Sequence, residues 1–152
     1  MRLSKKLDPD MVLISPDVAN RDGLFRLFGD LVAGAGLVKS ADVVVAKLME
    51  REKILSTGIG GGVAVPHAQL AGLGRLVMTA SSHPNGLEYP ALDDRPVRLV
   101  FCLLGDVNTT ADHLAGLARL ARLARRRTAL EPLVAAADGR AFVAALEELE
   151  GA

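Results

Sequence analysis

The chain has 152 residues, the usual size of one domain, so we predict a single domain over residues 1–152. Half of the residues are hydrophobic, which is enough for a core, and the single cysteine, Cys102, excludes an internal disulfide and suits a reducing compartment. The 18 basic residues balance the 18 acidic ones, and this zero net charge argues against general nucleic-acid binding, which needs a positive excess.

The beginning of the chain carries no targeting signal. Residues 1–14 contain no apolar stretch long enough for a signal peptide. No apolar run in the sequence approaches the roughly 18 residues that a membrane helix needs. The sequence therefore predicts a cytoplasmic protein that is not inserted in a membrane.

Two helices are predicted before the middle of the chain. The first shows apolar residues at helical spacing and stops at Gly34 and Gly36; its apolar residues are Leu24, Leu27, Phe28, Leu31 and Val32. Ser40 is the predicted N-cap of the second helix, whose apolar face consists of Val44, Val45, Leu48 and Met49. Residues 56–62 follow, and they are too rich in glycine to predict either regular element.

Strands and helices alternate in the rest of the chain. Strands are predicted over residues 63–65, 76–80 and 97–104, with a loop at 84–96; the last strand is almost all apolar, as expected of one covered on both faces. Residues 109–112 resemble a capping segment for a long helix with one apolar face, made of Leu114, Leu117, Ala118, Ala121 and Ala124. Further helices are predicted over residues 128–137, where Pro132 fits only the first turn, and 139–150. This alternation predicts the α/β class, with one sheet covered by helices on both faces.

The chemistry of the sequence is concentrated in residues 58–67. The glycines allow backbone N–H groups to approach an anion, but neither a Walker loop nor a dinucleotide fingerprint is present, since Gly-Lys-Ser/Thr is missing and Val63 occupies the third fingerprint position. A short strand then delivers His67, and Pro66 fixes the backbone before it. A histidine with one ring nitrogen held by a hydrogen bond keeps the other free to attack phosphorus at neutral pH.

Residues 51–67, which read REKILSTGIGGGVAVPH, closely resemble the signature of phosphotransferase-system enzyme IIA of the fructose/mannitol class, which includes nitrogen-regulatory members. Residues 91–93 and 97–104 and His113 are similar to later segments of this family, and the resemblance extends from Leu3 to about Leu149. It implies a mixed sheet like that of mannitol-type enzyme IIA. It also implies that His67 is phosphorylated, that His113 lies beside it, and that no cofactor is needed.

Other residues are candidates for contacts with the phosphoryl group. By resemblance Arg51 belongs to the site, where a guanidinium balances phosphoryl charge; the alternative is an arginine that only complements the helix end. Thr57 is a candidate hydroxyl donor or a turn residue. Gly58 and Gly60 are candidate phosphate-binding positions, more secure as sites of backbone freedom than as direct ligands.

The remaining chemically active side chains are assigned structural roles. His83 is predicted to be exposed and inert in a turn, and Cys102 to be a small core residue. The three histidines lack metal-ligand spacing, so no metal is predicted. The long helix is predicted to carry a solvated basic face, with docking to an acidic partner as the alternative; this arginine face consists of Arg119, Arg122, Arg125, Arg126 and Arg127.

The resemblance implies partners as well as a site. The expected donor is HPr or its nitrogen-branch counterpart, and the expected acceptor is an enzyme IIB or a regulatory target protein. The nitrogen-regulatory type is favoured because the chain carries no IIB domain or membrane segment, and a separate sugar-specific enzyme IIA is the alternative. A binding module without phosphotransfer is the hypothesis of a different class, which Pro66, His67 and His113 argue against.

Overall fold

The computed structural model describes residues 1–151 and contains one mixed sheet in the order β1-β5-β6-β3-β2, with β4 also paired to β6. The strands β5 and β6 are antiparallel, whereas β1 runs parallel to β5 and both β3 and β4 run parallel to β6. The strands are β1 (Val12–Ile14), β2 (Gly58–Gly60), β3 (Val63–Ala64), β4 (His67–Gln69), β5 (Val77–Leu87) and β6 (Val97–Gly105).

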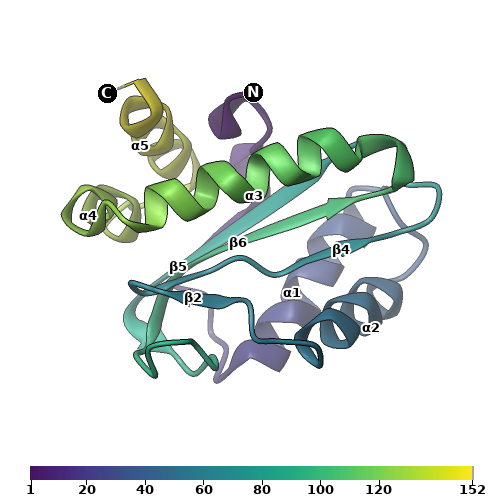
Figure 1. Cartoon of the computed structure of the whole chain (residues 1–152), viewed down its shortest axis with the longest axis horizontal. Helices are drawn as coiled ribbons and strands as arrows, with labels where there is room; N and C mark the ends of the chain where they lie inside the picture. The colour runs from purple at the N-terminus through teal and green to yellow at the C-terminus, as the bar shows by residue number, and fades with distance from the viewer. Residues whose placement is uncertain (152) are drawn as a thin grey trace.

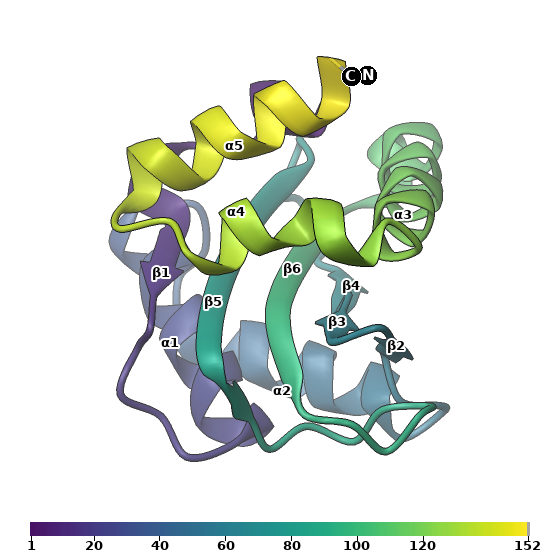
Figure 2. The same cartoon turned by 90° about the vertical axis from the view of Figure 1, so that its left-hand side faces the viewer.

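Helices cover both faces of the sheet, as the sequence predicted (Figures 1 and 2). One face packs against α1 (Arg21–Gly34) and α2 (Ala41–Glu52), and the other against α3 (Thr110–Ala124), α4 (Glu131–Val134) and α5 (Gly139–Gly151). Short 3-10 helices are formed by Leu3–Lys5, Pro9–Met11, Val107–Thr109 and Arg127–Leu130. Within residues 1–151, no helix has both the length and the apolar character that crossing a membrane requires.

Strand β6 divides the core into two layers. Leu99, Phe101 and Leu103 point to the side of α3 and α5, while the alternate residues Val100, Cys102 and Leu104 point to α1 and α2. All six side chains are buried, which explains the nearly continuous apolar run in the sequence. The predictions of a doubly covered strand and of a core position for Cys102 are confirmed.

The first two helices begin where their capping residues predict. The side chain of Asn20 accepts a hydrogen bond from Gly23 N at the start of α1, and the side chain of Ser40 accepts one from Asp42 N at the start of α2. The helices then pack closely, since a Cβ at Gly29 would lie 2.8 Å from the carbonyl oxygen of Ala41. The α2 helix ends beside the glycine-rich segment, which brings its last turn to the sheet edge.

The capping and the buried face of α3 differ from the prediction. Asp106 forms a capping box with Thr109, so the segment is capped four residues before α3 begins at Thr110. The buried residues of α3 are His113, Gly116, Leu120, Leu123 and Ala124. Of the predicted face, Ala124 is buried, Leu117 is half-buried, and Leu114, Ala118 and Ala121 are exposed. The true core stripe includes a histidine and a glycine, which a search for apolar periodicity passes over.

Two predicted loops contain strand. Gly58–Gly60 forms β2, antiparallel to β3, and β5 continues to Leu87 through the first part of the predicted loop at residues 84–96. The register of β5 against β6 is broken between Ser82 and Leu87, so Pro84 lies where no regular ladder bond is required. The predicted helix over residues 128–137 is shorter, consisting of a 3-10 turn and α4, with Pro132 in the first turn of α4 as expected.

Candidate functional site

A shallow pocket of about 420 Å³ lies between α2 and α3, with β4 at its base. The three elements meet here because β4 pairs with the end of β6, from which the chain turns into α3 (Figure 1). The pocket is lined by Lys47, Glu50, Arg51, Ile54, His67, Ala68, Gln69, His113, Leu114 and Leu117. The structure thus brings together the three predicted residues of the phosphoryl site: His67, His113 and Arg51.

His67, the first residue of β4, is held in one tautomer. Its Nδ1 lies 2.8 Å from the carbonyl oxygen of Val65, and because a carbonyl only accepts, Nδ1 carries the proton and Nε2 keeps its lone pair. Burial lowers the pKa of His67; the hydrogen bond to Val65 raises it, the charge of Arg51 lowers it and that of Glu52 raises it, with a net decrease. The lowered pKa favours the neutral imidazole of His67 at pH 7, and the lone pair of that imidazole is on Nε2.

The second histidine lies against the first. The ring centroids of His67 and His113 are 5.5 Å apart, and the rings are inclined at 70°. Burial and the neighbouring His67 lower the pKa of His113, which is only 6% exposed. Its buried Nδ1 has no hydrogen-bond partner among the described residues and lies where a Cβ of Gly105 would be 3.0 Å away. A glycine at the end of β6 therefore makes room for this ring.

Arg51 reaches the pocket from the last turn of α2. Its Nη1 donates a hydrogen bond of 2.8 Å to the carbonyl oxygen of Leu55, so the guanidinium is folded over the loop that follows the helix. A guanidinium has five N–H donors, which leaves others available to an anion at His67. The arrangement allows a phosphoryl group on His67 to be met by Arg51 from one side and His113 from another.

Thr57, Gly58 and Gly60, the candidate phosphate-binding residues, are not among the residues that line this pocket. Thr57 is 2% exposed, and its hydroxyl donates to the carboxylate of Glu52 and lies 2.5 Å from the hydroxyl of Tyr89. A Cβ at Gly58 would lie 2.7 Å from Cα of Ala91. Gly60 has a φ of +92°, which favours glycine. All three residues hold the loop in shape instead.

The prediction for His83 is wrong. This histidine is 6% exposed, belongs to β5, and pairs through Nε2 with Ser81 Oγ at 2.7 Å. Burial lowers its pKa to about 4. Cys102 is fully buried, and burial raises the pKa of its thiol to about 12, so it is an unreactive core residue.

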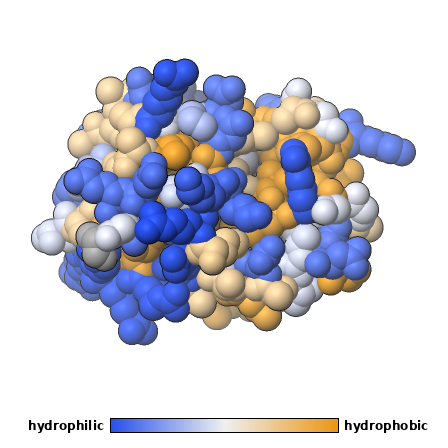
Figure 3. All heavy atoms as spheres, turned by 90° about the horizontal axis from the view of Figure 1, so that it is seen from above, coloured by the Kyte–Doolittle hydropathy of each residue, from blue (hydrophilic) through white to orange (hydrophobic). Residues whose placement is uncertain are grey.

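The arginine face divides into two parts. Arg119 Nε donates to Glu150 at 3.1 Å and Arg126 Nη1 to the carbonyl oxygen of Leu149 at 3.0 Å, so both hold α5. Arg122, Arg125 and Arg127 are exposed. Figure 3 shows hydrophilic side chains over much of this face and hydrophobic ones gathered on the side where α3 begins. Within residues 1–151, no group of three or more His, Cys, Asp or Glu side chains has an arrangement that could hold a metal ion.

Sequence reasoning missed Glu52 and the apolar rim of the pocket. Glu52 is a buried carboxylate in the last turn of α2. An acidic residue is unfavourable at the C-terminal end of a helix, where basic residues are preferred, and this mismatch could have indicated a special role. Ile54 and Leu114 are 78% and 61% exposed on either side of the histidines. Exposed apolar residues around a reactive side chain are typical of a surface that docks another protein.

Comparisons with known proteins agree with this geometry. A family model described as "Phosphoenolpyruvate-dependent sugar phosphotransferase system, EIIA 2" matches residues 5–149. A nitrogen regulatory protein of Klebsiella oxytoca is 34% identical over 137 residues, covering 90% of this chain and 84% of the relative. A PTS system fructose-specific EIIA component of Haloferax volcanii is 28% identical, covering 84% and 82%. The crystal structure of the nitrogen regulatory protein IIA-Ntr from Neisseria meningitidis aligns with a TM-score of 0.86 and 29% identity, covering 95% and 98%.

Proposed function

Since this chain belongs to the EIIA 2 family of the phosphoenolpyruvate-dependent sugar phosphotransferase system, we propose that it is a phosphocarrier that accepts a phosphoryl group on His67 and passes it on. The observation that carries the proposal is the tautomer of His67. Its Nδ1 is bound to the carbonyl of Val65, and its Nε2 belongs to a half-exposed ring in the pocket between α2 and α3.

The transfer follows from this geometry. The lone pair of His67 Nε2 attacks the phosphorus of a phosphohistidine on the donor, so that a new N–P bond forms while the donor's N–P bond breaks. The electron pair of the broken bond returns to the donor imidazole. Arg51 and a ring N–H of His113 balance the charge of the phosphoryl oxygens, and the reaction needs positioning and electrostatics rather than a cofactor.

The donor in this proposal is a protein of the HPr type, met in the cytoplasm. Ile54 and Leu114 give it an apolar surface on both sides of the histidines, and Lys47, Glu50 and Arg51 give the same surface a charged edge. A small apolar patch with a charged edge supports brief docking, which suits a carrier that must release its partner after each transfer.

The proposed downstream role is nitrogen-branch regulation, in which the phosphorylated and unphosphorylated forms bind different target proteins. The high structural similarity to the IIA-Ntr of Neisseria meningitidis supports it. A second candidate is a freestanding sugar-specific enzyme IIA that passes the group to an enzyme IIB. It is supported by the fructose-specific EIIA component of Haloferax volcanii, because this chain covers 82% of that relative. Transfer of label from the phosphorylated chain to a purified enzyme IIB would distinguish the two.

The site is tested with phospho-HPr and intact-mass measurement. Wild type should gain one acid-labile, base-stable phosphoryl group, whereas His67→Ala should gain none, because no other histidine presents a free ring nitrogen in the same anchored geometry. The control is His83→Gln, which alters a buried histidine outside the pocket and should label like wild type. Equal labelling of His67→Ala would show that the acceptor is misassigned. No labelling of folded wild type by any donor of this class would favour the binding module.

A further inference from the structure

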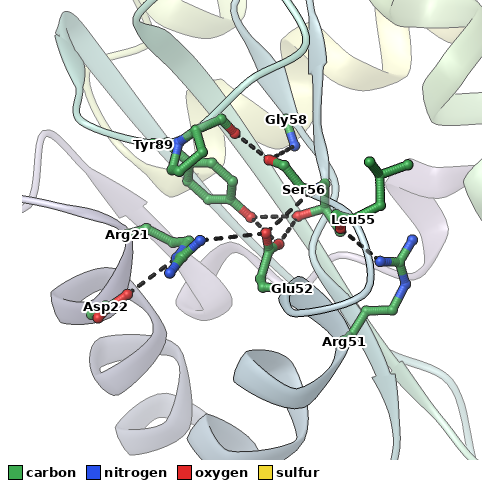
Figure 4. A network of polar contacts seen from close by, with 10 residues as sticks. Arg21, Asp22, Arg51, Glu52, Leu55, Ser56, Gly58 and Tyr89 are labelled. Carbon is green, nitrogen blue, oxygen red and sulfur yellow. Dashed lines mark hydrogen bonds and ion pairs between the residues drawn. The ribbon is translucent and has the colours of Figure 1, made fainter. Parts of the chain in front are cut away.

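Glu52 is a buried carboxylate that lies directly next to Arg51 in the sequence. Its side chain is only 2% exposed. It accepts hydrogen bonds from the Tyr89 hydroxyl at 2.9 Å, from Thr57 N at 3.3 Å and from the Thr57 hydroxyl, and Arg21 Nη1 lies 3.6 Å away. Figure 4 shows Arg21, from α1, and Tyr89, from the segment after β5, pointing toward this one carboxylate. Several donors to its oxygens offset the cost of burying this carboxylate.

These bonds fix the short segment between Glu52 and Thr57. The carboxylate is at the end of α2 and its partner Thr57 is five residues later, so the two residues close the intervening loop. The Ser56 hydroxyl binds the carbonyl oxygen of Pro90, which holds the same loop against the sheet. The side chains of Ile54 and Leu55 are 78% and 59% exposed, so they contribute little packing. The backbone of this loop is therefore placed mainly by polar contacts.

The loop in turn holds Arg51. The Leu55 carbonyl oxygen, which accepts the 2.8 Å bond from Arg51 Nη1, lies inside the segment that Glu52 and Thr57 close. Both charges act on the acceptor: that of Arg51 lowers the pKa of His67 and that of Glu52 raises it. Glu52 therefore has a mechanical path to Arg51, through the loop, and is also close enough to His67 to be felt electrostatically.

We propose that Glu52 is a positioning residue for phosphoryl transfer, which places the Arg51 guanidinium beside His67 by fixing the loop whose Leu55 carbonyl holds it. The inference rests on the proposed phosphocarrier function. Glu52 does not touch the phosphoryl group itself. Its carboxylate faces Tyr89 and Arg21 (Figure 4) and binds Thr57, and Glu52 is absent from the lining of the pocket.

The test is a double-mutant cycle in single-turnover transfer from phospho-HPr. Glu52→Gln keeps the shape of the side chain but removes its charge, and we expect transfer about tenfold slower, with the half-saturating donor concentration unchanged. In an Arg51→Ala background the same substitution should slow transfer by less than about twofold, because the group that Glu52 positions is already missing. A full tenfold further loss in that background, or a wild-type rate for Glu52→Gln, would overturn the proposal.

A matched control separates positioning from general destabilisation. Glu150 is an equally buried carboxylate, which accepts hydrogen bonds of 2.8 Å from the backbone of Leu3 and Ser4 and lies outside the pocket. Glu150→Gln should therefore lower stability and leave transfer unchanged. If Glu52→Gln does not fold, Tyr89→Phe removes one donor from the carboxylate and should give a smaller defect that also vanishes with Arg51→Ala. If Tyr89→Phe still slows transfer in the Arg51→Ala background, the proposal is contradicted.

An NMR measurement that needs no phosphoryl-donor protein can test the positioning role of Glu52 separately from the proposed phosphocarrier function. The Nε–H signal of Arg51, followed by nitrogen-15 relaxation, should show an ordered guanidinium in wild type and a mobile one in Glu52→Gln. An equally ordered signal in both would overturn the positioning role even if His67 is phosphorylated. If wild type is not labelled at His67, the proposed function fails, and the relaxation result still decides whether Glu52 holds Arg51.

Discussion

At the scale of single residues, the site depends on two histidines that are kept neutral for different tasks. His67 has its proton fixed on Nδ1 by Val65, which directs its nucleophilic nitrogen into the pocket. His113 lies in the first turn of α3, where the helix dipole and the free backbone N–H groups favour an anion nearby. The same positive potential makes its ring a poor base. In the proposed function, His113 is therefore suited to donate a hydrogen bond to the phosphoryl group on His67.

Substitution of His113 tests this division of roles. We expect His113→Ala to accept the phosphoryl group but to pass it on slowly or hold it less stably, because a hydrogen bond to a charged group contributes about 1.5–3 kcal/mol. His113→Gln should retain more activity, since its amide can still donate. Single-turnover acceptance from phospho-HPr and release to an acceptor protein measure the two steps separately. Label that maps to His113 in wild type would reverse the assignment.

The sequence was informative about residues whose role depends on near neighbours in the chain. His67 follows Pro66 and the glycine segment directly, so its motif could be recognised from a short stretch. The contact of Thr57 with Tyr89 was not predicted, because the two residues are 32 positions apart and no local pattern pairs them. His83 was placed on the surface because Pro84 and Asn85 predict a turn, whereas the strand pairing of β5 with β6 buries it.

At the scale of elements, the Ser40 cap and the main apolar strand were predictable, whereas the cap and the phase of α3 were not. The Ser40 hydroxyl accepts a hydrogen bond from the backbone N–H of Asp42, only two residues later, so this cap can be predicted from a short stretch of sequence. The buried stripe of α3 contains Gly116, where a Cβ would lie 3.3 Å from the side chain of Leu103 in β6. Gly116 must be small because Leu103 packs against it, and the sequence alone does not show that these two residues are in contact. The apolar residues Leu114 and Leu117 face the pocket instead, where they serve its surface.

The glycine segment offers a test at this scale, because its predicted role was chemical and its observed role is structural. We expect Gly58→Ala to reduce the free energy of unfolding by about 1–3 kcal/mol, since the new Cβ overpacks β2 against Ala91 and the carbonyl of Pro90. Urea denaturation measures this as a lower midpoint at an unchanged slope. The folded fraction should still be phosphorylated, because Gly58 does not line the pocket.

The control for this substitution is Gly34→Ala at the end of α1. A Cβ there meets no atom within 4 Å, so the change should be neutral or stabilising by up to about 1 kcal/mol. A stable Gly58→Ala protein that has lost phosphorylation would restore the prediction that this glycine contacts the phosphoryl group.

At the scale of the whole molecule, the two ends of the chain close the α3–α5 side of the fold. The carboxylate of Glu150 accepts hydrogen bonds from Leu3 N, Ser4 N and Arg119 Nε, so α5 is joined both to the N-terminal segment and to α3. Figures 1 and 2 both show α5 next to the N-terminal segment. Burial alone would raise the pKa of Glu150, but these hydrogen bonds lower it. Residues from both ends of the sequence and Arg119 of α3 are thereby joined at a point outside the pocket.

The stability of the whole fold should depend on pH through His83. The pKa of this buried histidine is about 4 in the folded protein and about 6.5 when unfolded, so between these values the unfolded chain binds more protons. Its contribution is fully present above pH 6.5 and is lost as the pH falls toward 4. Since one pKa unit corresponds to about 1.4 kcal/mol, the loss is at most about 3.5 kcal/mol.

Urea denaturation of wild type and His83→Gln at pH 7 and pH 4.5 measures this dependence. Glutamine can still hydrogen-bond Ser81 but does not titrate, so the variant should lose less stability on acidification than wild type. His67 and His113 also have lowered pKa values, but they are present in both proteins, and their contribution cancels in the comparison. An NMR titration gives an independent check, because the His83 ring should stay neutral down to about pH 5. Equal losses in the two proteins, or a His83 ring that titrates near 6.5, would show that the fold does not keep this histidine neutral.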